Sequence, residues 1–321
     1  MRAELESILK ELRSKPLLLI GLGIVLALAI AMPFSVNNYI LSFFNNMLGF
    51  VVMATAWMLF SGTTKYISLA TAAFFGLGAY LVAGLGEHLP YPVLMVVVAL
   101  SGFLVALVVG LSTLRLSGVY FTIFTFGLTE LVRQIVTWYQ VKVLGSVGSY
   151  IDIESSAADI YWRMLVLAIV LYLVGFLLLR SRIGLALNAI GADETVAKHS
   201  GINVMGVKLG VFALTSVFMT LTGAIMAPRW TYIDPPIAFN VIASFEVLIM
   251  ALLGGVGRLW GPIVGVVPML LVSEYLSTRF PNYFTILLGL AFMAIVYYIP
   301  GGIVGVIEEY WRKHRRPASK K

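Results

Sequence analysis

Cysteine, histidine and charged residues are all scarce in this sequence. The 321 residues include no cysteine, which excludes a disulfide, a thiolate metal site and a cysteine nucleophile. The histidines number three, His88, His199 and His314, and their wide spacing predicts that the chain binds no metal. Charged residues make up 12% of the chain, whereas they are about a quarter of a soluble domain. The composition is therefore not typical of a soluble or metal-dependent enzyme.

Signatures of catalysis and of nucleotide binding are missing as well. Serine, histidine and acidic residues form no readable hydrolase constellation, and the pattern Gly-x4-Gly-Lys-Ser/Thr of a phosphate-binding loop does not occur. Because that loop supplies the backbone N–H groups that cradle phosphates, we expect that the chain does not bind ATP itself. The sequence predicts a protein that is not an enzyme, with no catalytic residue and no cofactor.

Apolar residues, in contrast, are abundant and gathered into long runs. They make up 60% of the chain, and the mean hydropathy is +0.97. Each run is long enough to cross about 30 Å of hydrocarbon, which predicts an all-α polytopic membrane protein. We place ten transmembrane helices at roughly residues 17–32, 38–60, 67–86, 91–112, 117–137, 161–179, 207–228, 240–256, 261–278 and 283–304.

The basic residues are distributed unevenly over the segments that join these spans. With the N-terminus inside, all of them fall in inner segments except Arg133, Lys142, Arg163, Arg229 and Arg279. Because Lys and Arg collect in cytoplasmic loops, we predict a multi-pass protein of the plasma or inner membrane with both termini in the cytoplasm. The same rule accounts for the net charge of +7 without a nucleic-acid partner.

The two ends of the chain differ from the transmembrane domain, residues 16–305. Residues 1–15 are predicted to form an amphipathic helix on the membrane surface. Its apolar face would consist of Leu5, Ile8, Leu9 and Leu12. Residues 306–321 form a basic tail, which is typical of a topology anchor near anionic membrane lipid.

A polar segment, residues 180–208, interrupts the apolar runs on the predicted cytoplasmic side. Asp193 is a favourable helix N-cap, and Glu194 places negative charge in the first turn, where the helix dipole favours it. Gly201 suits a left-handed C-terminal stop, so residues 194–200 should form a two-turn helix. A helix this short is not stable alone. Apolar contacts could come from Leu187, Ile190, Val196, Ala197 and Ile202. The helix is either an ordinary loop helix or the docking point of a water-soluble partner.

Two glycine-rich stretches, residues 61–80 and 252–269, interrupt apolar runs in the two halves of the chain. Paired glycine-broken segments are typical of a transport pathway lined by broken helices. Small residues also allow membrane helices to pack closely without any role in transport. The sequence leaves both interpretations open.

Ionisable residues inside the predicted spans are candidates for a translocation path, because charges at such depths usually face a polar cavity or one another. Glu130 and Arg133 are three residues apart and can pair on one helix face. Glu246 falls in the same half of the membrane, so a zwitterionic solute would meet both signs there. The alternative is a structural ion pair.

Several motifs together resemble one known family. Those around the polar segment are Ser181-Arg182-Ile183-Gly184, Asp193-Glu194, Ala197, and Gly201-Ile202-Asn203-Val204. Others are Ser68-Leu69, Ser244-Phe245-Glu246, Leu253-Gly254-Gly255-Val256-Gly257, Trp260-Gly261-Pro262 and Pro300-Gly301-Gly302. As a set, over about residues 40–305, they are similar to the LivM-type permeases, the membrane subunits of ABC importers for branched-chain amino acids.

This resemblance implies a larger machine. Such a permease works with a second, related permease chain, two cytoplasmic ATPase subunits that bind ATP, and an extracytoplasmic solute-binding protein. The polar segment resembles the family's coupling loop, which implies that Asp193, Glu194, Ala197 and Gly201 couple the permease to an ATPase subunit. The translocation path would include Glu130, Arg133, Glu246 and Ser68.

Some positions depart from the family pattern and leave the substrate open. Gly191 stands where arginine or another polar residue is frequent, and Ala70 stands where glycine is common. Related permeases carry urea or amides, so an importer of those solutes is one alternative. Another is a secondary transporter or channel driven by an ion gradient, in which Glu130 and Glu246 would serve proton or sodium coupling.

Overall fold

A computed structural model describes residues 29–116, 118–298 and 302–305. Residues up to Phe44 and residues from Asn45 onward form separate units, and the sites described below lie in the second. The helices are α3 (Asn38–Trp57), α4 (Thr71–Leu85), α5 (Tyr91–Thr113), α6 (Val119–Tyr139), α7 (Ala157–Arg180), α8 (Arg182–Ala192), α9 (Glu194–His199), α10 (Val204–Met226), α11 (Pro235–Ala238), α12 (Val241–Gly254), α13 (Gly261–Arg279) and α14 (Phe284–Tyr298). π-helical turns follow α3 (Met58–Gly62) and α6 (Gln140–Leu144), 3-10 turns are Ala227–Arg229 and Pro281–Tyr283, and the strands are β1 (Ser149–Tyr150) and β2 (Tyr232–Ile233).

The all-α polytopic prediction is confirmed, but the count of ten spans is not. Seven helical segments of the described chain are long and apolar enough to cross a membrane. Two further predicted spans correspond to α4 and α14, which have 15 residues each. The first predicted span, the helix predicted at residues 1–15 and the tail at 306–321 fall largely or wholly outside the described residues.

Helix α10 packs against both α4 and α5 and is the most buried of the seven long segments. Glycine makes this packing close. A Cβ at Gly78 would lie 1.9 Å from the Thr220 carbonyl oxygen, and one at Gly223 would lie 1.9 Å from the Phe75 carbonyl oxygen. Only glycine fits at such distances, so these residues set the spacing of α4 and α10.

The second glycine-rich stretch packs α12 against α13 in the same manner. A Cβ at Gly265 would lie 1.9 Å from the Met250 carbonyl oxygen, and one at Gly254 would lie 2.0 Å from that of Gly261. Close packing of helices therefore explains several glycines of both stretches. Each stretch also contains backbone outside any helix, at residues 65–70 and 255–260.

The non-helical residues 65–70 are held by side chains of neighbouring helices. The Trp57 indole N–H donates to the Ser68 carbonyl at 2.8 Å, and the Thr125 hydroxyl accepts from the Leu69 N–H at 3.0 Å. Irregular backbone inside a membrane protein is stable where such partners replace the helical hydrogen bonds. This segment explains why α4 begins at Thr71, later than the predicted span.

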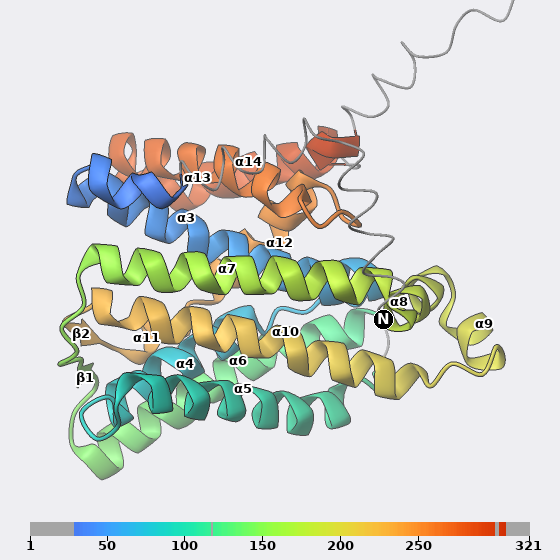
Figure 1. Cartoon of the computed structure of the whole chain (residues 1–321), viewed down its shortest axis with the longest axis horizontal. Helices are drawn as coiled ribbons and strands as arrows, with labels where there is room; N and C mark the ends of the chain where they lie inside the picture. The colour runs from blue at the N-terminus through green and yellow to red at the C-terminus, as the bar shows by residue number, and fades with distance from the viewer. Residues whose placement is uncertain (1–28, 117, 299–301, 306–321) are drawn as a thin grey trace, which may run out of the picture. The chain divides into compact units, whose positions relative to one another are not determined.

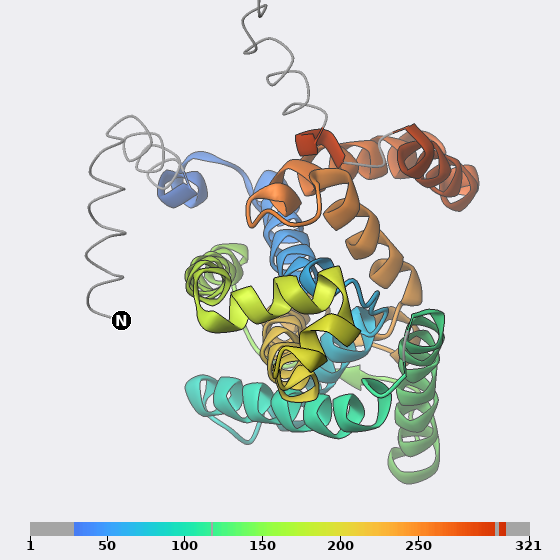
Figure 2. The same cartoon turned by 90° about the vertical axis from the view of Figure 1, so that its right-hand side faces the viewer.

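The loops gather at two opposite ends of the helices (Figure 1). At one end β1 pairs with β2 in antiparallel register, with Ser149 opposite Ile233. The outer loop predicted after residue 137 is shorter than expected, because helical structure continues to Leu144. Within this continuation the buried Gln140 side chain donates to Ser149 Oγ at 2.8 Å, which ties it to β1. At the other end lie α8 and α9, which face the viewer in Figure 2.

Candidate functional site

Helix α9 has a defined start and a defined end. Asp193 is extended, and its carboxylate accepts from the N–H groups of Thr195 and Val196 at 2.8 and 3.0 Å. Gly201 has a φ of 82°, a left-handed conformation that favours glycine. The predicted cap, helix and stop are therefore confirmed, with the helix at Glu194–His199.

One face of α9 is buried and the other is exposed. Ala197 is 1% exposed and forms a small apolar cluster with Ile190 of α8 and Val204 of α10. Two large apolar side chains point away from this cluster: Leu185 of α8 is 70% exposed and Val196 of α9 is 61% exposed. Beside α9, an open pocket of about 350 Å³ is lined by Arg115, Lys198 and neighbouring residues. The two helices thus form a projecting surface that is apolar in places and basic in others.

A polar cluster of three residues fastens α9 to the spans. The Glu194 carboxylate pairs with Lys208 Nζ of α10 at 2.9 Å and accepts a hydrogen bond from the Tyr66 hydroxyl at 2.5 Å. The Lys208 ammonium, 2% exposed, also lies 4.1 Å from the centre of the Tyr66 ring and 3.5 Å from the Leu114 carbonyl oxygen. One carboxylate therefore connects α9 with α10 and with the segment that precedes α4.

The cluster lowers the pKa of Glu194. Partial burial by itself raises the pKa of this carboxyl, but the hydrogen bonds from Tyr66 and Lys208 and the charge of Lys208 outweigh it. Because these partners favour the charged form, Glu194 is a carboxylate at neutral pH. It is a structural anion, held by its neighbours in the cluster.

Helix α8 touches the same region through its backbone. A Cβ at Gly191 would lie 2.0 Å from the Thr63 carbonyl oxygen, so no larger residue fits there without a shift. This contact gives a physical reason for glycine at position 191. It also links α8 to the turn that ends at Gly62.

Two members of the cluster were not predicted as site residues. The position of Lys208 in the sequence does indicate a polar contact, since a lysine in the first turns of an apolar helix needs a partner. The sequence around Tyr66 gives no such indication, because 128 positions separate Tyr66 from Glu194 and nothing local distinguishes it from other aromatic residues.

The other predicted residues lie in separate places. Glu130 and Arg133 form the expected ion pair at 2.5 Å on α6, with side chains 41% and 32% exposed. Neither is among the residues that line the pocket at Glu246, a cavity of about 210 Å³ between α3, α4 and α12. The structure therefore does not bring the three charges together, and their role in a path stays a prediction.

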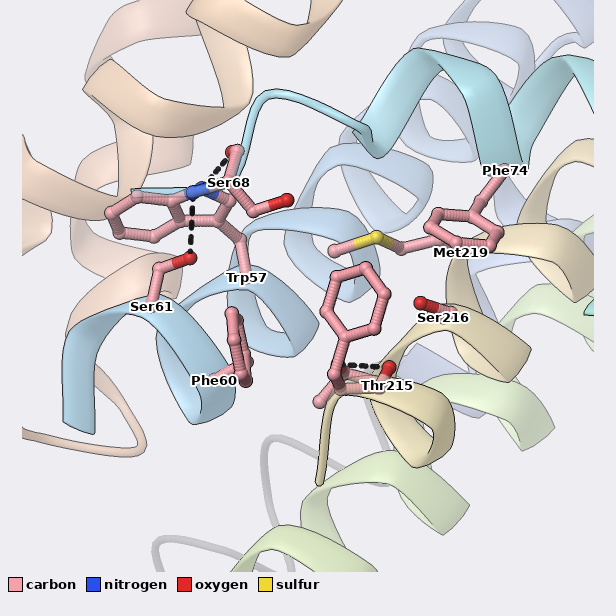
Figure 3. A pocket seen from close by; sticks show the side chains of 9 residues that line it. Trp57, Phe60, Ser61, Ser68, Phe74, Thr215, Ser216 and Met219 are labelled. Atoms are coloured by element: carbon pink, nitrogen blue, oxygen red, sulfur yellow. Dashed lines mark hydrogen bonds between the residues drawn. The ribbon is translucent and has the colours of Figure 1, made fainter. Parts of the chain in front are cut away.

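Ser68 lines a different and much smaller cavity (Figure 3). Its space of about 10 Å³ is roughly that of one water molecule, and the bulky neighbours Trp57, Phe60 and Phe74 surround it. An amino acid does not pass Ser68 in this conformation. A path role for Ser68 requires these side chains to move.

Comparison with known proteins shows the family to which the chain belongs. The family model for the permease component of branched-chain amino acid transport systems matches residues 39–296. The high-affinity branched-chain amino acid permease protein LivM of Escherichia coli strain K12 is 26% identical over an alignment that covers 87% of this chain and 73% of the relative. LivM of Salmonella typhimurium strain LT2 is 24% identical, with the same coverage.

A sugar permease is similar over a shorter region. The xylose transport system permease protein XylH of Haemophilus influenzae is 33% identical over 131 residues, which cover 40% of this chain and 34% of the relative. No solved structure matches the chain. Since the family model spans most of the sequence and includes the capped helix α9, the chain is a multi-pass membrane protein that belongs to the family of branched-chain amino acid transport system permeases.

Proposed function

We propose that this protein is the membrane-spanning subunit of an ATP-driven importer for branched-chain or other hydrophobic amino acids. It works with a second permease chain, two ATPase subunits that bind ATP, and a solute-binding protein on the opposite side of the membrane. The two LivM relatives are named as high-affinity branched-chain amino acid permeases, which supports this class of substrate. The chain itself carries no ATP site, and hydrolysis takes place in the partner subunits.

Helix α9 is the coupling helix in this proposal, and the observation that carries it is the cluster at Glu194. A short helix transmits force only if it does not slide against the spans. Asp193 and Gly201 define its two ends, Ala197 seats it on α8 and α10, and Glu194 fastens it to Lys208 and Tyr66. Closure of the ATPase pair then moves α9, α10 and the segment before α4 as one body.

The proposed orientation places α8, α9 and both termini in the cytoplasm. The basic residues support it, because Arg115, Arg182 and Lys198 lie in the inner segments of the predicted topology. The exposed Leu185 and Val196 then face an ATPase subunit, and the end with β1 and β2 faces the solute-binding protein.

Two substitutions test the coupling role. Glu194→Lys places a second cation beside the buried Lys208, and Gly201→Val forces a β-branched residue into a left-handed conformation. In proteoliposomes that hold the whole importer, we expect either change to reduce leucine uptake at least about tenfold, equivalent to about 1.4 kcal/mol, while ATP hydrolysis continues.

A matched control separates the loss of coupling from a general effect of replacing a glycine with valine. Gly127 lies on α6 with nothing within 4 Å of an added Cβ, so Gly127→Val should leave uptake unchanged. Wild-type uptake in the Glu194 and Gly201 variants would refute the coupling role. Uptake by the wild type that continues without ATP while an ion gradient is intact would favour the secondary-transporter alternative.

A further inference from the structure

The cavity at Glu246 has two chemically distinct parts. Most of its lining is apolar and includes Phe50, Met53, Phe75 and Met226. Its polar groups include the carboxylate of Glu246. Its volume of about 210 Å³ is below that of a pocket for a drug-sized ligand, about 300 Å³ or more. The cavity therefore suits a small, amphiphilic molecule.

One residue that lines this cavity has a buried hydroxyl without a partner among the described residues. Thr71 is 2% exposed, its Oγ1 makes no hydrogen bond within the described chain, and the residue lines the cavity. Most buried hydroxyls have a hydrogen-bond partner, because leaving one unsatisfied costs about 1–3 kcal/mol. An unpaired group at this position is explained if a ligand supplies the partner.

Thr71 is also the first residue of α4, whose N-terminus meets the cavity. The N-cap residue Ala70 has no side-chain cap, and the first turn contains no acidic residue. A helix N-terminus carries partial positive charge and favours an anionic group. Together with the unpaired hydroxyl, it forms a place for a carboxylate.

Glu246 provides the opposite charge at the same cavity. No described side chain forms a hydrogen bond or ion pair with its carboxylate. The Ser244 hydroxyl, fully buried, accepts from the Ala72 N–H at 2.9 Å. This bond fixes the start of α12 against the start of α4, so that Glu246 and Thr71 are held at one cavity.

We propose that this cavity is a subsite for the transported amino acid within a single permease chain. The ammonium group binds Glu246, the carboxylate binds the Thr71 hydroxyl and the N-terminus of α4, and the branched side chain fills the apolar part. The inference rests on the proposed function, because it assumes that an amino acid is the transported solute. A sugar fits less well, since its many hydroxyls would face an apolar wall without partners.

The test uses the whole importer in proteoliposomes, with radiolabelled leucine supplied through the solute-binding protein. Glu246→Gln removes the charge and should reduce the initial uptake rate by about 10- to 100-fold, the range for a charged hydrogen bond. Thr71→Val should reduce it by about three- to tenfold, the range for a neutral one. Glu246→Asp keeps the charge and should retain more uptake than Glu246→Gln.

The matched control for Thr71→Val is Thr113→Val. Thr113 is also buried and its hydroxyl has no partner among the described residues, but it lies at the end of α5 and outside this cavity. We expect wild-type uptake from Thr113→Val. Thr71→Val and Thr113→Val should both copurify with the ATPase subunits, and Thr113→Val should also keep basal ATP hydrolysis, since replacing an unpaired buried hydroxyl with a methyl group does not destabilise a fold.

The outcomes separate the two proposals. If the wild-type importer takes up no branched-chain amino acid, the proposed function fails. If the wild type transports leucine and both Glu246→Gln and Thr71→Val do so equally well, only the subsite is refuted. Photo-leucine crosslinking of the wild-type importer gives an answer that needs no variant. Labelled peptides containing Phe50, Met53 or Met226 support the subsite, and labels confined to other helices overturn it.

Discussion

Glu194 and Glu246 are both acidic residues of a membrane protein, and each lines a pocket, but they differ in their hydrogen-bond partners. The Glu194 carboxylate is saturated, with an ammonium at 2.9 Å and a hydroxyl at 2.5 Å. The Glu246 carboxylate borders an open cavity together with a second unsatisfied group, the Thr71 hydroxyl. A saturated charge connects parts of the protein, whereas an unsatisfied one is suited to a ligand. The comparison therefore separates the proposed coupling region from the proposed subsite.

The largest effect on stability is expected at the Glu194 cluster, in the proposed coupling region. Glu194→Ala leaves the Lys208 ammonium, 2% exposed, without its carboxylate. Breaking a buried pair costs about 3–5 kcal/mol. Because the Glu194 side chain is 40% exposed, we expect a loss of about 2 kcal/mol, measured as a lower melting temperature in detergent.

A second substitution and a control sharpen this prediction. Glu194→Ala combined with Lys208→Met removes both charges, so most of the lost stability should return. Glu130→Ala breaks a more exposed pair on α6 and should lower the melting temperature much less. Equal effects of Glu194→Ala and Glu130→Ala would contradict a special role of the Glu194 cluster.

At Glu246 we expect a substitution to raise the stability of the protein and not to lower it. An acidic residue without a protein partner inside a span destabilises the fold, so Glu246→Leu should raise stability by about 1 kcal/mol while it abolishes uptake. The measurement is the melting temperature of the variant beside its uptake rate. A clear decrease in melting temperature would show that Glu246 is a structural residue like Glu194.

The smallest effect concerns pH. The pKa of Glu194 is lowered below its ordinary value of 4.5, so the folded protein binds a proton there less readily than the unfolded chain. The stability that this shift provides is complete above the ordinary pKa and is lost as the pH falls through the lower folded pKa. The difference in melting temperature between wild type and Glu194→Gln should be constant from pH 8 to about pH 6 and shrink under acidic conditions. A difference that grows on acidification would contradict the assignment.

Local signals predicted helix α9 well. A cap at Asp193, a charge at Glu194 and a glycine stop at Gly201 act within one short segment, so the sequence contains all the information needed for α9. Apolar runs predicted most of the spans for the same reason. Residues 65–70 were harder, because their non-helical backbone depends on Trp57 and Thr125, which lie elsewhere in the chain.

The composition of the sites depends on contacts between distant residues. Tyr66 contacts Glu194, and Thr71 shares a cavity with Glu246, although the members of each pair are far apart in the sequence. Glycines such as Gly78 and Gly223 let α4 and α10 approach closely. The sequence predicted a role for Glu246 but gave no indication that Thr71 lies at the same cavity. It also grouped Glu246 with Glu130 and Arg133, since it could not show that they lie at different sites.

Thiol labelling tests the central claim, that α9 is a cytoplasmic helix docked on an ATPase subunit, most directly. Because the chain contains no cysteine, Val196→Cys and Val147→Cys each provide a single exposed thiol at opposite ends of the helices. We predict that an impermeant maleimide labels Val196→Cys only from the cytoplasmic side, that bound ATPase subunits block this labelling, and that Val147→Cys reacts only from the other side. Labelling of Val196→Cys from outside, or labelling unchanged by the ATPase subunits, would contradict the account.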